Sequence, residues 1–274
     1  MELNGASVLL TGGSRGIGPH IARALLARGA TVTLAARSKD GLERVRESLG
    51  TDRVAVVPAD VTDEDGRSSA VAAAEEAFGR IDVLVNNAGI EHVLRFVDHS
   101  EEDISSIVRV NLEAPMLLAR QVLPGMLEHR HGHIVNISSV AGKAAVPYNT
   151  VYAGTKHALV GWSLSLRAEL HRSGVGVSVI CPGYVAEAGF VEHRLVEAPF
   201  SAGTGTTPRE VAAAVVRAVE RDLPEVIVSG FLPRLSDITL AISPRLFEAA
   251  ARRSGGWLPL QREADARARA RRGE

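Results

Sequence analysis

Short runs of β-branched and apolar residues alternate along the chain with longer segments in which apolar residues recur at helical spacing. This alternation is typical of repeated strand–helix–strand units, whose parallel sheet is buried between helices on both faces. The sequence therefore predicts an α/β fold. The expected strands are Ser7–Leu10, Thr31–Ala35, Val54–Val57, Val83–Val85, His133–Ile137, Val175–Ile180 and Val226–Val228. The clearest expected helices are Gly18–Arg28, Thr62–Phe78, roughly Ser100–Glu128, Val151–Ser173 and Pro208–Arg221.

The composition limits the partners and the compartment. With 274 residues, 46% of them hydrophobic and 23% charged, the chain is long enough to bury one large core. A formal net charge of -1 gives no general attraction to nucleic acid or to an anionic membrane. The single cysteine, Cys181, excludes an internal disulfide and fits a reducing compartment, so the cytoplasm is expected. Neither a signal sequence nor a membrane span is recognisable.

Two segments depart from the alternation. Residues 183–207 follow a strand end, where open α/β sheets place their ligand crevices, and are interpreted as a substrate lid. Residues 231–274 are expected to form a helical extension with a charged tail. The apolar residues of its first part either face a membrane surface or are buried within the protein or its oligomer, and burial is favoured. Ala264–Glu274, mostly alternating Ala and Arg, is interpreted as a solvated or fraying end.

A glycine-rich turn, Thr11–Gly18, joins the first strand to the first helix. Its spacing differs from the usual G-x-G-x-x-G pattern. Gly12 and Gly16 nevertheless permit tight backbone turns, Gly18 permits close packing, and the following helix points free amide groups at a phosphate. The turn is thus either a dinucleotide phosphate site or an ordinary strand-to-helix loop.

The end of the second strand bears on the form of the coenzyme. An acidic side chain there would bind an adenosine ribose, whereas a cation suits a 2′-phosphate. The chain has Arg37 at this turn and no acid, and Arg15 lies in the glycine turn. Both guanidinium groups can form charge-assisted bonds to phosphate, so NADP (NADPH) is favoured over NAD. The alternative is that both arginines are solvated surface residues.

Two later segments fit the same crevice. Asp60, followed by Val61, comes just after the third strand, where its carboxylate either meets the adenine edge or caps the helix expected to begin near Thr62. The run Asn86-Asn87-Ala88-Gly89 follows the fourth strand, where small residues let the backbone approach a flat cofactor ring.

Tyr152 and Lys156 lie four residues apart on one predicted helix, so they share a face. A neighbouring ammonium favours tyrosinate and lowers the pKa of the phenol from about 10. Tyr152 is then able to give a proton to a substrate carbonyl or take one from an alcohol. A hydroxyl that follows the fifth strand, from Ser138 or Ser139, suits the developing alkoxide. Tyr148 has no lysine four residues beyond it and is interpreted as a pocket wall.

Together these motifs resemble the classical short-chain dehydrogenase/reductase family. The glycine turn, Asn86–Gly89, Ser139, Tyr152-x-x-x-Lys156 and Pro182-Gly183 occur in family order and span about residues 6–230. The resemblance implies a single Rossmann-type doubly wound domain over residues 1–230, with a mostly parallel seven-stranded sheet, a nicotinamide coenzyme and a homodimer or homotetramer.

The resemblance also implies residue roles. The family's spacing between serine and tyrosine selects Ser139 over Ser138. By the same resemblance, Asn111 is the active-site asparagine that holds a water linked to Lys156, and Lys156 binds the nicotinamide ribose. Glu187 stands where family members often carry a threonine that bonds the carboxamide. The expected catalytic residues are therefore Asn111, Ser139, Tyr152 and Lys156. The expected coenzyme contacts are Gly12, Ser14, Arg15, Gly16, Ile17, Gly18, Arg37, Asp60, Val61, Asn87, Ala88, Gly89, Tyr152, Lys156, Pro182, Gly183 and Val185.

No metal site is expected. His129, His131 and His133 alternate near a strand start without acidic or thiol ligands, and Cys181 is interpreted as a small core residue. The sequence thus favours an NADP-dependent carbonyl reductase. The alternatives are an NAD-dependent alcohol dehydrogenase and a coenzyme-responsive binding protein without catalysis. The apolar lid residues favour a hydrophobic ketone or acyl chain as the substrate, and they are Phe190, Val191, Leu195 and Phe200.

Overall fold

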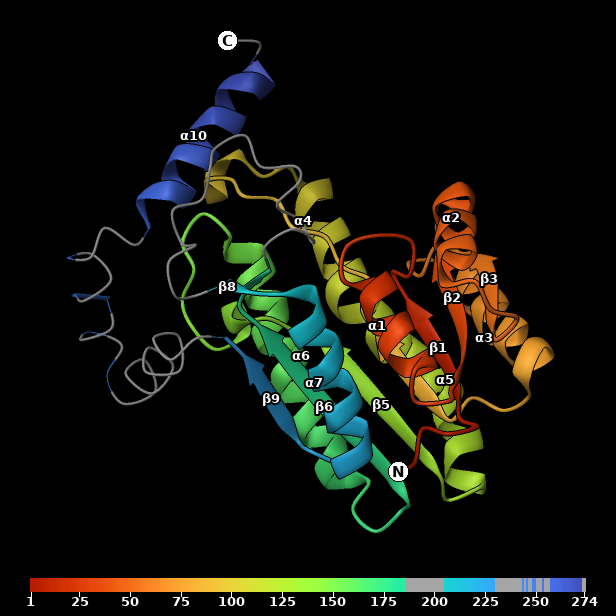
Figure 1. Cartoon of the computed structure of the whole chain (residues 1–274). Coiled ribbons are helices and arrows are strands. Elements are labelled where there is room, and N and C mark those ends of the chain that lie inside the picture. The colour runs from red at the N-terminus through yellow and green to blue at the C-terminus, as the bar shows by residue number, and fades with distance from the viewer. Residues whose placement is uncertain are drawn as a thin grey trace.

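The computed structural model describes residues 1–185, 205–229 and 257–272, with a few single positions between 243 and 253 (Figure 1). Its centre is a seven-stranded sheet in the order β3-β2-β1-β4-β5-β6-β9, and all neighbouring strands are parallel. The strands are β1 (Ser7–Thr11), β2 (Thr31–Ala36), β3 (Val54–Pro58), β4 (Val83–Asn86), β5 (Gly132–Ile137), β6 (Val175–Pro182) and β9 (Glu225–Val228). The order reverses between β1 and β4, which places a ligand crevice at their carboxyl ends.

Helices cover both faces of the sheet (Figure 1). One face is packed by α1 (Gly18–Leu26), α2 (Lys39–Leu49) and α7 (Pro208–Arg221), and the other by α3 (Glu64–Phe78), α5 (Ala114–Glu128) and α6 (Thr150–Glu169). Strands such as β1 and β4 are buried along their whole length, which is why each has three successive apolar residues, Val8–Leu10 and Val83–Val85, rather than an alternating pattern. The predicted α/β architecture is confirmed.

The predicted strands match the structure closely, and the helices before α6 differ from the prediction in three respects. The helix α2, left unspecified by the sequence, fills the gap after β2. The segment predicted as one helix from Ser100 to Glu128 is divided into α4 (Glu101–Val108), a π-helical turn η2 (Arg109–Glu113) and α5. The helix predicted from Thr62 begins at Glu64, because Asp63 is its N-cap and accepts a hydrogen bond from the Gly66 N–H.

The interpretation of the C-terminal tail as a fraying end was wrong. Residues Leu258–Arg272 form a helix, α10, in which Leu260, Ala264 and Ala268 are buried. Leu260 and Ala264 pack against Val93. A strict Ala/Arg alternation has period two, so every fourth residue is also apolar. That hidden period of four gives the helix a narrow stripe of small residues for packing.

Much of the predicted lid and extension lies outside the described residues, including Glu187, Phe190, Val191, Leu195, Phe200 and the apolar run from Phe231 to Ile242. At the two ends of the lid, β7 (Tyr184–Val185) and β8 (Gly205–Thr206) pair in a small parallel sheet. Within the described part of the chain, no helix is both long and apolar enough to cross a membrane.

The buried His133 on β5 predicts a loss of stability in acid. Its Nε2 lies 2.8 Å from the Ser178 hydroxyl, and its ring is 2% exposed. Burial lowers the pKa of His133 from 6.5 to about 4, against the opposing effect of Asp222. Between these values the unfolded chain binds the proton more readily than the folded chain does, so falling pH favours unfolding. We expect this histidine to remove about 2 kcal/mol of the free energy of unfolding between pH 7 and pH 5.

Urea unfolding at the two pH values checks this expectation. The difference in the free energy of unfolding between pH 7 and pH 5 should be smaller in His133→Gln than in the wild type. His129→Gln, which changes an exposed residue, should show the same difference as the wild type. Equal pH dependence in all three proteins would contradict the assignment.

Candidate active site

The carboxyl ends of the strands bring the predicted site residues to one edge of the sheet. The parallel register aligns Thr11 with Ala35, Asn86 with Asn136, and Ile137 with Ile180. The segments that follow these strands therefore lie together at this edge. They carry the glycine turn, Arg37, Asp60, residues 87–89, Ser139 and Pro182.

The glycine turn is fastened to the segment after β4. The Thr11 hydroxyl oxygen accepts hydrogen bonds from the Asn87 and Ala88 N–H groups, at 3.0 and 3.1 Å. In return, the Asn87 amide donates to the carbonyl oxygens of Thr11 and Gly12. These hydrogen bonds join two segments about 75 residues apart in the sequence, Thr11–Gly12 and Asn87–Ala88. Gly89 is the next residue after the second segment.

The geometry of this turn fits a dinucleotide phosphate. Gly12 and Gly16 have positive φ angles of 66° and 64°, and a Cβ on Gly12 would lie 2.8 Å from the Asn87 amide nitrogen. A Cβ on Gly18 would lie 2.3 Å from the Gly12 oxygen, so only glycine permits this close packing. Ile17, the N-cap of α1, offers no side-chain hydrogen bond, and the first turn of the helix has no acidic residue. The positive end of α1 is accordingly suited to an anion.

Arg37 lies at the end of β2 beside the glycine turn. The N-terminus of α2 packs closely against that turn: Gly41 is so near Ser14 that an added Cβ on Gly41 would lie 3.1 Å from the Ser14 Cβ. The Arg37 side chain is 72% exposed, and its guanidinium approaches the Asp60 carboxylate only to 3.9 Å. A guanidinium held this loosely is available to an incoming phosphate.

Asp60 does not cap a helix, so that alternative was wrong. Its Oδ1 accepts hydrogen bonds from the Thr62 N–H at 2.9 Å and from the Thr62 hydroxyl at 2.8 Å, which forms a local turn ahead of Asp63. Burial raises the pKa of Asp60, but the Thr62 hydrogen bonds and Arg37 outweigh this and lower it. The adjoining Val61 is buried, and its carbonyl accepts a bond from Arg67.

Tyr152 and Lys156 share one face of α6, as their spacing predicts. The Lys156 Nζ lies 5.4 Å from the centre of the Tyr152 ring. Both residues are buried, Lys156 with 4% and Tyr152 with 7% of its surface exposed. The ammonium donates to the Ile137 carbonyl at 2.9 Å. Burial lowers the pKa of Lys156 from 10.5 to about 8, while Cys181 and Glu91 act in the opposite direction. Near neutral pH this lysine is thus a cation whose charge is little screened by water.

The two serines after β5 have different partners. The Ser138 hydroxyl is buried and donates to the Lys156 carbonyl at 3.0 Å, so it fastens β5 to α6. Ser139 is the N-cap of the short helix η3 (Val140–Gly142), and its hydroxyl reaches the Pro182 carbonyl at 3.5 Å. The helix η3 packs against Tyr152 through Ala141, which brings the segment that begins at Ser139 close to α6.

Asn111 sits in the π-helical turn η2 and is completely buried. Its side-chain oxygen accepts from the Ile90 N–H at 2.9 Å, and its amide donates to the Ile90 carbonyl at 2.8 Å. The same amide lies 3.4 Å from the Thr155 hydroxyl of α6. The widened turn thus aims one amide at the segment after Gly89 and at the helix that carries Tyr152 and Lys156.

Sequence reasoning missed several buried polar residues that support the site, namely Asn136, Ser163 and Asn149. The Asn86 amide donates to Asn136 on β5 at 2.9 Å, and the Asn136 amide donates to Ser163 on α6, also at 2.9 Å. At the start of α6, the buried Asn149 donates to Glu91 at 3.0 Å. The sequence signal for these hydrogen bonds is Asn136, which lies within the otherwise mostly apolar strand β5. A buried amide must find hydrogen-bond partners, so its presence there indicates polar neighbours.

The remaining predicted residues also have definite places. Pro182 ends β6, the Gly183 N–H donates to the Val228 carbonyl at 2.8 Å, and Val185 lies in β7. Cys181 is fully buried beside them. Of the three alternating histidines, His133 is in the core, whereas His129 is exposed and contacts the Gly125 carbonyl.

Comparison with known proteins identifies this arrangement. The family model for short chain dehydrogenases matches residues 6–195. A ketoacyl reductase, HetN, from Nostoc sp. is 44% identical over 229 residues, which cover 83% of this chain and 79% of HetN. An oxidoreductase, UcpA, from Salmonella typhimurium is 43% identical over 187 residues, which cover 67% of this chain and 71% of UcpA.

Two solved structures share the fold. An actinorhodin polyketide ketoreductase variant with NADPH has a TM-score of 0.75 and 31% identity, covering 83% of this chain and 97% of that one. A 3-ketoacyl-(acyl-carrier-protein) reductase from Brucella melitensis, in complex with NADH, has a TM-score of 0.76 and 27% identity, covering 82% and 97%. The chain belongs to the short-chain dehydrogenase/reductase family and is an oxidoreductase.

Proposed function

We propose that this oxidoreductase uses NADPH to reduce a ketone or aldehyde to an alcohol. The observation that carries the proposal is the buried Tyr152–Lys156 pair on one face of α6, against which the helix that begins after Ser139 packs. The bound nicotinamide would supply the hydride, and the protein must supply the proton and stabilise the charge that develops on the substrate oxygen.

Tyr152 is the proton donor in this proposal. Its hydroxyl gives a proton to the carbonyl oxygen, and the nearby Lys156 ammonium favours the tyrosinate that remains. The Ser139 hydroxyl donates a hydrogen bond to the same oxygen as it gains charge. Asn111 keeps the segment around Ile90 and α6 in register, and it is proposed to hold the water through which Lys156 exchanges protons.

The coenzyme is proposed to lie along the carboxyl ends of β1, β4 and β5. Its phosphates would meet the backbone of Gly12–Gly18, and its adenosine 2′-phosphate would meet Arg37, with Arg15 nearby. The exposure of Arg37 and the absence of an acidic residue directly after β2 support NADPH over NADH. Asp60 and Val61 would border the adenine, and Asn87–Gly89, Pro182, Gly183 and Val185 the nicotinamide half, with Lys156 on the ribose.

A hydrophobic carbonyl compound is the proposed substrate class. Beside Tyr152, the partly buried Val146 packs both against the Tyr152 cluster and against Leu260 and Ala264 of α10. These contacts make part of the surroundings of Tyr152 apolar, and the proteins compared above include two ketoacyl reductases. The protein is further proposed to act in the cytoplasm as a homodimer or homotetramer, with residues 1–230 as the catalytic domain and 231–274 as its extension.

A panel of aliphatic and aromatic ketones, β-ketoesters and aldehydes, followed by the absorbance of NADPH at about 340 nm, tests this function. We expect oxidation of NADPH that depends on the carbonyl compound and is faster with longer apolar chains. A protein that binds NADPH but oxidises none of it with any member of the panel would instead be a coenzyme-responsive binding protein. Faster turnover with NADH would indicate the alternative coenzyme.

A further inference from the structure

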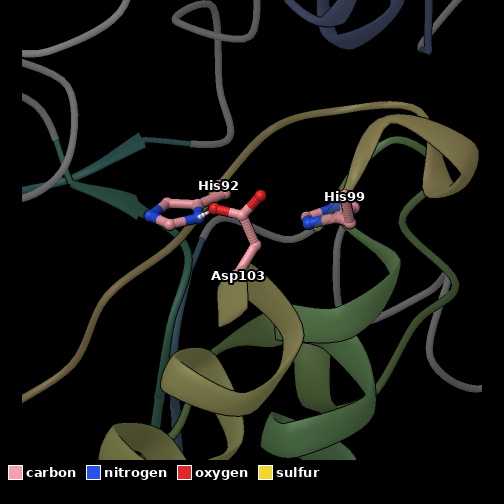
Figure 2. A group of neighbouring side chains, drawn as sticks. All are labelled: His92, His99 and Asp103. Atoms are coloured by element: carbon pink, nitrogen blue, oxygen red, sulfur yellow. Dashed lines mark ion pairs between the residues drawn. The ribbon is translucent and has the colours of Figure 1, made fainter. Parts of the chain in front are cut away.

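Three side chains with metal-binding donor atoms meet where the segment after Ile90 reaches the first turn of α4. They are His92, His99 and Asp103, and one donor atom from each lies within 4.8 Å of the other two. Figure 2 shows a ring nitrogen of each histidine turned toward the Asp103 carboxylate. The cluster takes no part in the proton transfer proposed for Tyr152.

Polar atoms without partners gather at this place. Among the residues that the structure describes, neither of the two buried ring nitrogens of His99 has a hydrogen-bond partner, and the same holds for Oδ2 of the neighbouring Asp98. Buried polar groups in proteins are nearly always paired, so each such atom calls for an explanation. A cation bound between the imidazoles and the carboxylates would be ligated by one ring nitrogen of His99 and could also be ligated by Oδ2 of Asp98.

Asp103 is already oriented as a ligand would be. Its Oδ2 accepts hydrogen bonds from the Ser100 N–H at 2.9 Å and from Arg271 Nη1 at 2.8 Å. Its Oδ1 lies 3.0 Å from His92 Nδ1 and 3.1 Å from Arg271 Nη2. Carboxylates that bind metals are commonly held by such outer hydrogen bonds. A metal on Oδ1 would replace one of the two guanidinium contacts and leave the other in place.

We propose that His92, His99 and Asp103 bind one divalent transition-metal ion of the zinc class, with Asp98 or water completing the coordination. Two imidazoles and one carboxylate are ligands that Zn²⁺ accepts in a tetrahedral site. Bonds of about 2.1 Å place the donor atoms about 3.4 Å apart. The His92 Nδ1 and Asp103 Oδ1 atoms are 3.0 Å apart, and separations of up to 4.8 Å within the cluster have to shorten by at most about 1.4 Å, within the reach of a side-chain rotation. The ion fastens the segment 90–99, which borders the site, to α4.

Titration calorimetry of the chelator-treated full-length protein with ZnCl₂ tests this proposal. We expect one equivalent to bind with a micromolar or lower Kd. His92→Ala and His99→Gln should each weaken binding at least tenfold, whereas His171→Ala, which removes an exposed histidine far from the cluster, should leave it unchanged. Asp103 is left intact because it also forms the capping box of α4.

Two further readouts separate a true site from a folding effect. Circular dichroism without metal should be the same for all variants, and Co²⁺ should give the visible absorption of a tetrahedral ion in the wild type but not in His99→Gln. The proposal is overturned if the wild type binds no Zn²⁺, or if His92→Ala and His99→Gln bind it as tightly as the His171→Ala control does.

Discussion

Tyr152→Phe is expected to lower kcat for carbonyl reduction by about 10²–10⁴-fold, the range that a general acid contributes. The change removes one hydroxyl from a ring that is 7% exposed and packed against Ala141 and Ala153. The Phe ring fills the same space and still faces the Lys156 ammonium. The fold and the coenzyme cradle, which is built from β1, β4 and their loops, should therefore be preserved.

Two measurements make this result specific. The Kd for NADPH, from fluorescence titration, should remain within about twofold of the wild-type value, since the hydroxyl is assigned to proton transfer. Tyr148→Phe is the matched control, because Tyr148 packs against Val93 and Leu260 and has no lysine one turn beyond it. Turnover retained in Tyr152→Phe, or lost equally in Tyr148→Phe, would remove the proposed role.

Arg37→Ala is expected to raise the Kd for NADPH by about 10–100-fold and to change the Kd for NADH by less than about threefold. A hydrogen bond to a charged group contributes about 1.5–3 kcal/mol, and this one is available only when the 2′-phosphate is present. The loose 3.9 Å approach between Arg37 and Asp60 means that little intramolecular interaction is lost on substitution.

The control for this experiment is Arg44→Ala, which removes an exposed arginine of α2. It should leave both dissociation constants unchanged, so a general loss of positive charge is distinguished from a contact at the end of β2. Equal weakening of NADPH and NADH in Arg37→Ala would defeat the phosphate assignment, and a wild type that prefers NADH would do so more directly.

The sequence predicted the sheet and the crevice because their determinants are local. Strands buried on both faces are mainly apolar, and the turn before α1 needs glycine at Gly12 for its positive φ and at Gly18 for close packing against Gly12. The Tyr152–Lys156 face follows from helical spacing alone. Each of these features is decided by residues within one element or one turn.

Features that depend on distant partners were beyond the same reasoning. The helix α10 was obscured because an Ala/Arg alternation contains a period of four, and only contact with Val93 reveals which residues it buries. Asp60 was an equal candidate for a helix cap until Asp63 proved to hold that place. The cluster of His92, His99 and Asp103 depends on how a loop folds back over α4, which no spacing rule specifies.

Transfer of deuterium from [4-²H]NADPH to a reduced ketone tests the central claim most directly. With the coenzyme labelled on the transferring face and an active ketone from the panel, we expect mass spectrometry to find one deuterium on the carbinol carbon of the alcohol. We also expect Tyr152→Phe to form that product at a rate reduced in the same proportion as kcat. An alcohol without deuterium from either face of the labelled coenzyme, or no alcohol from a protein that binds NADPH tightly, would contradict the account.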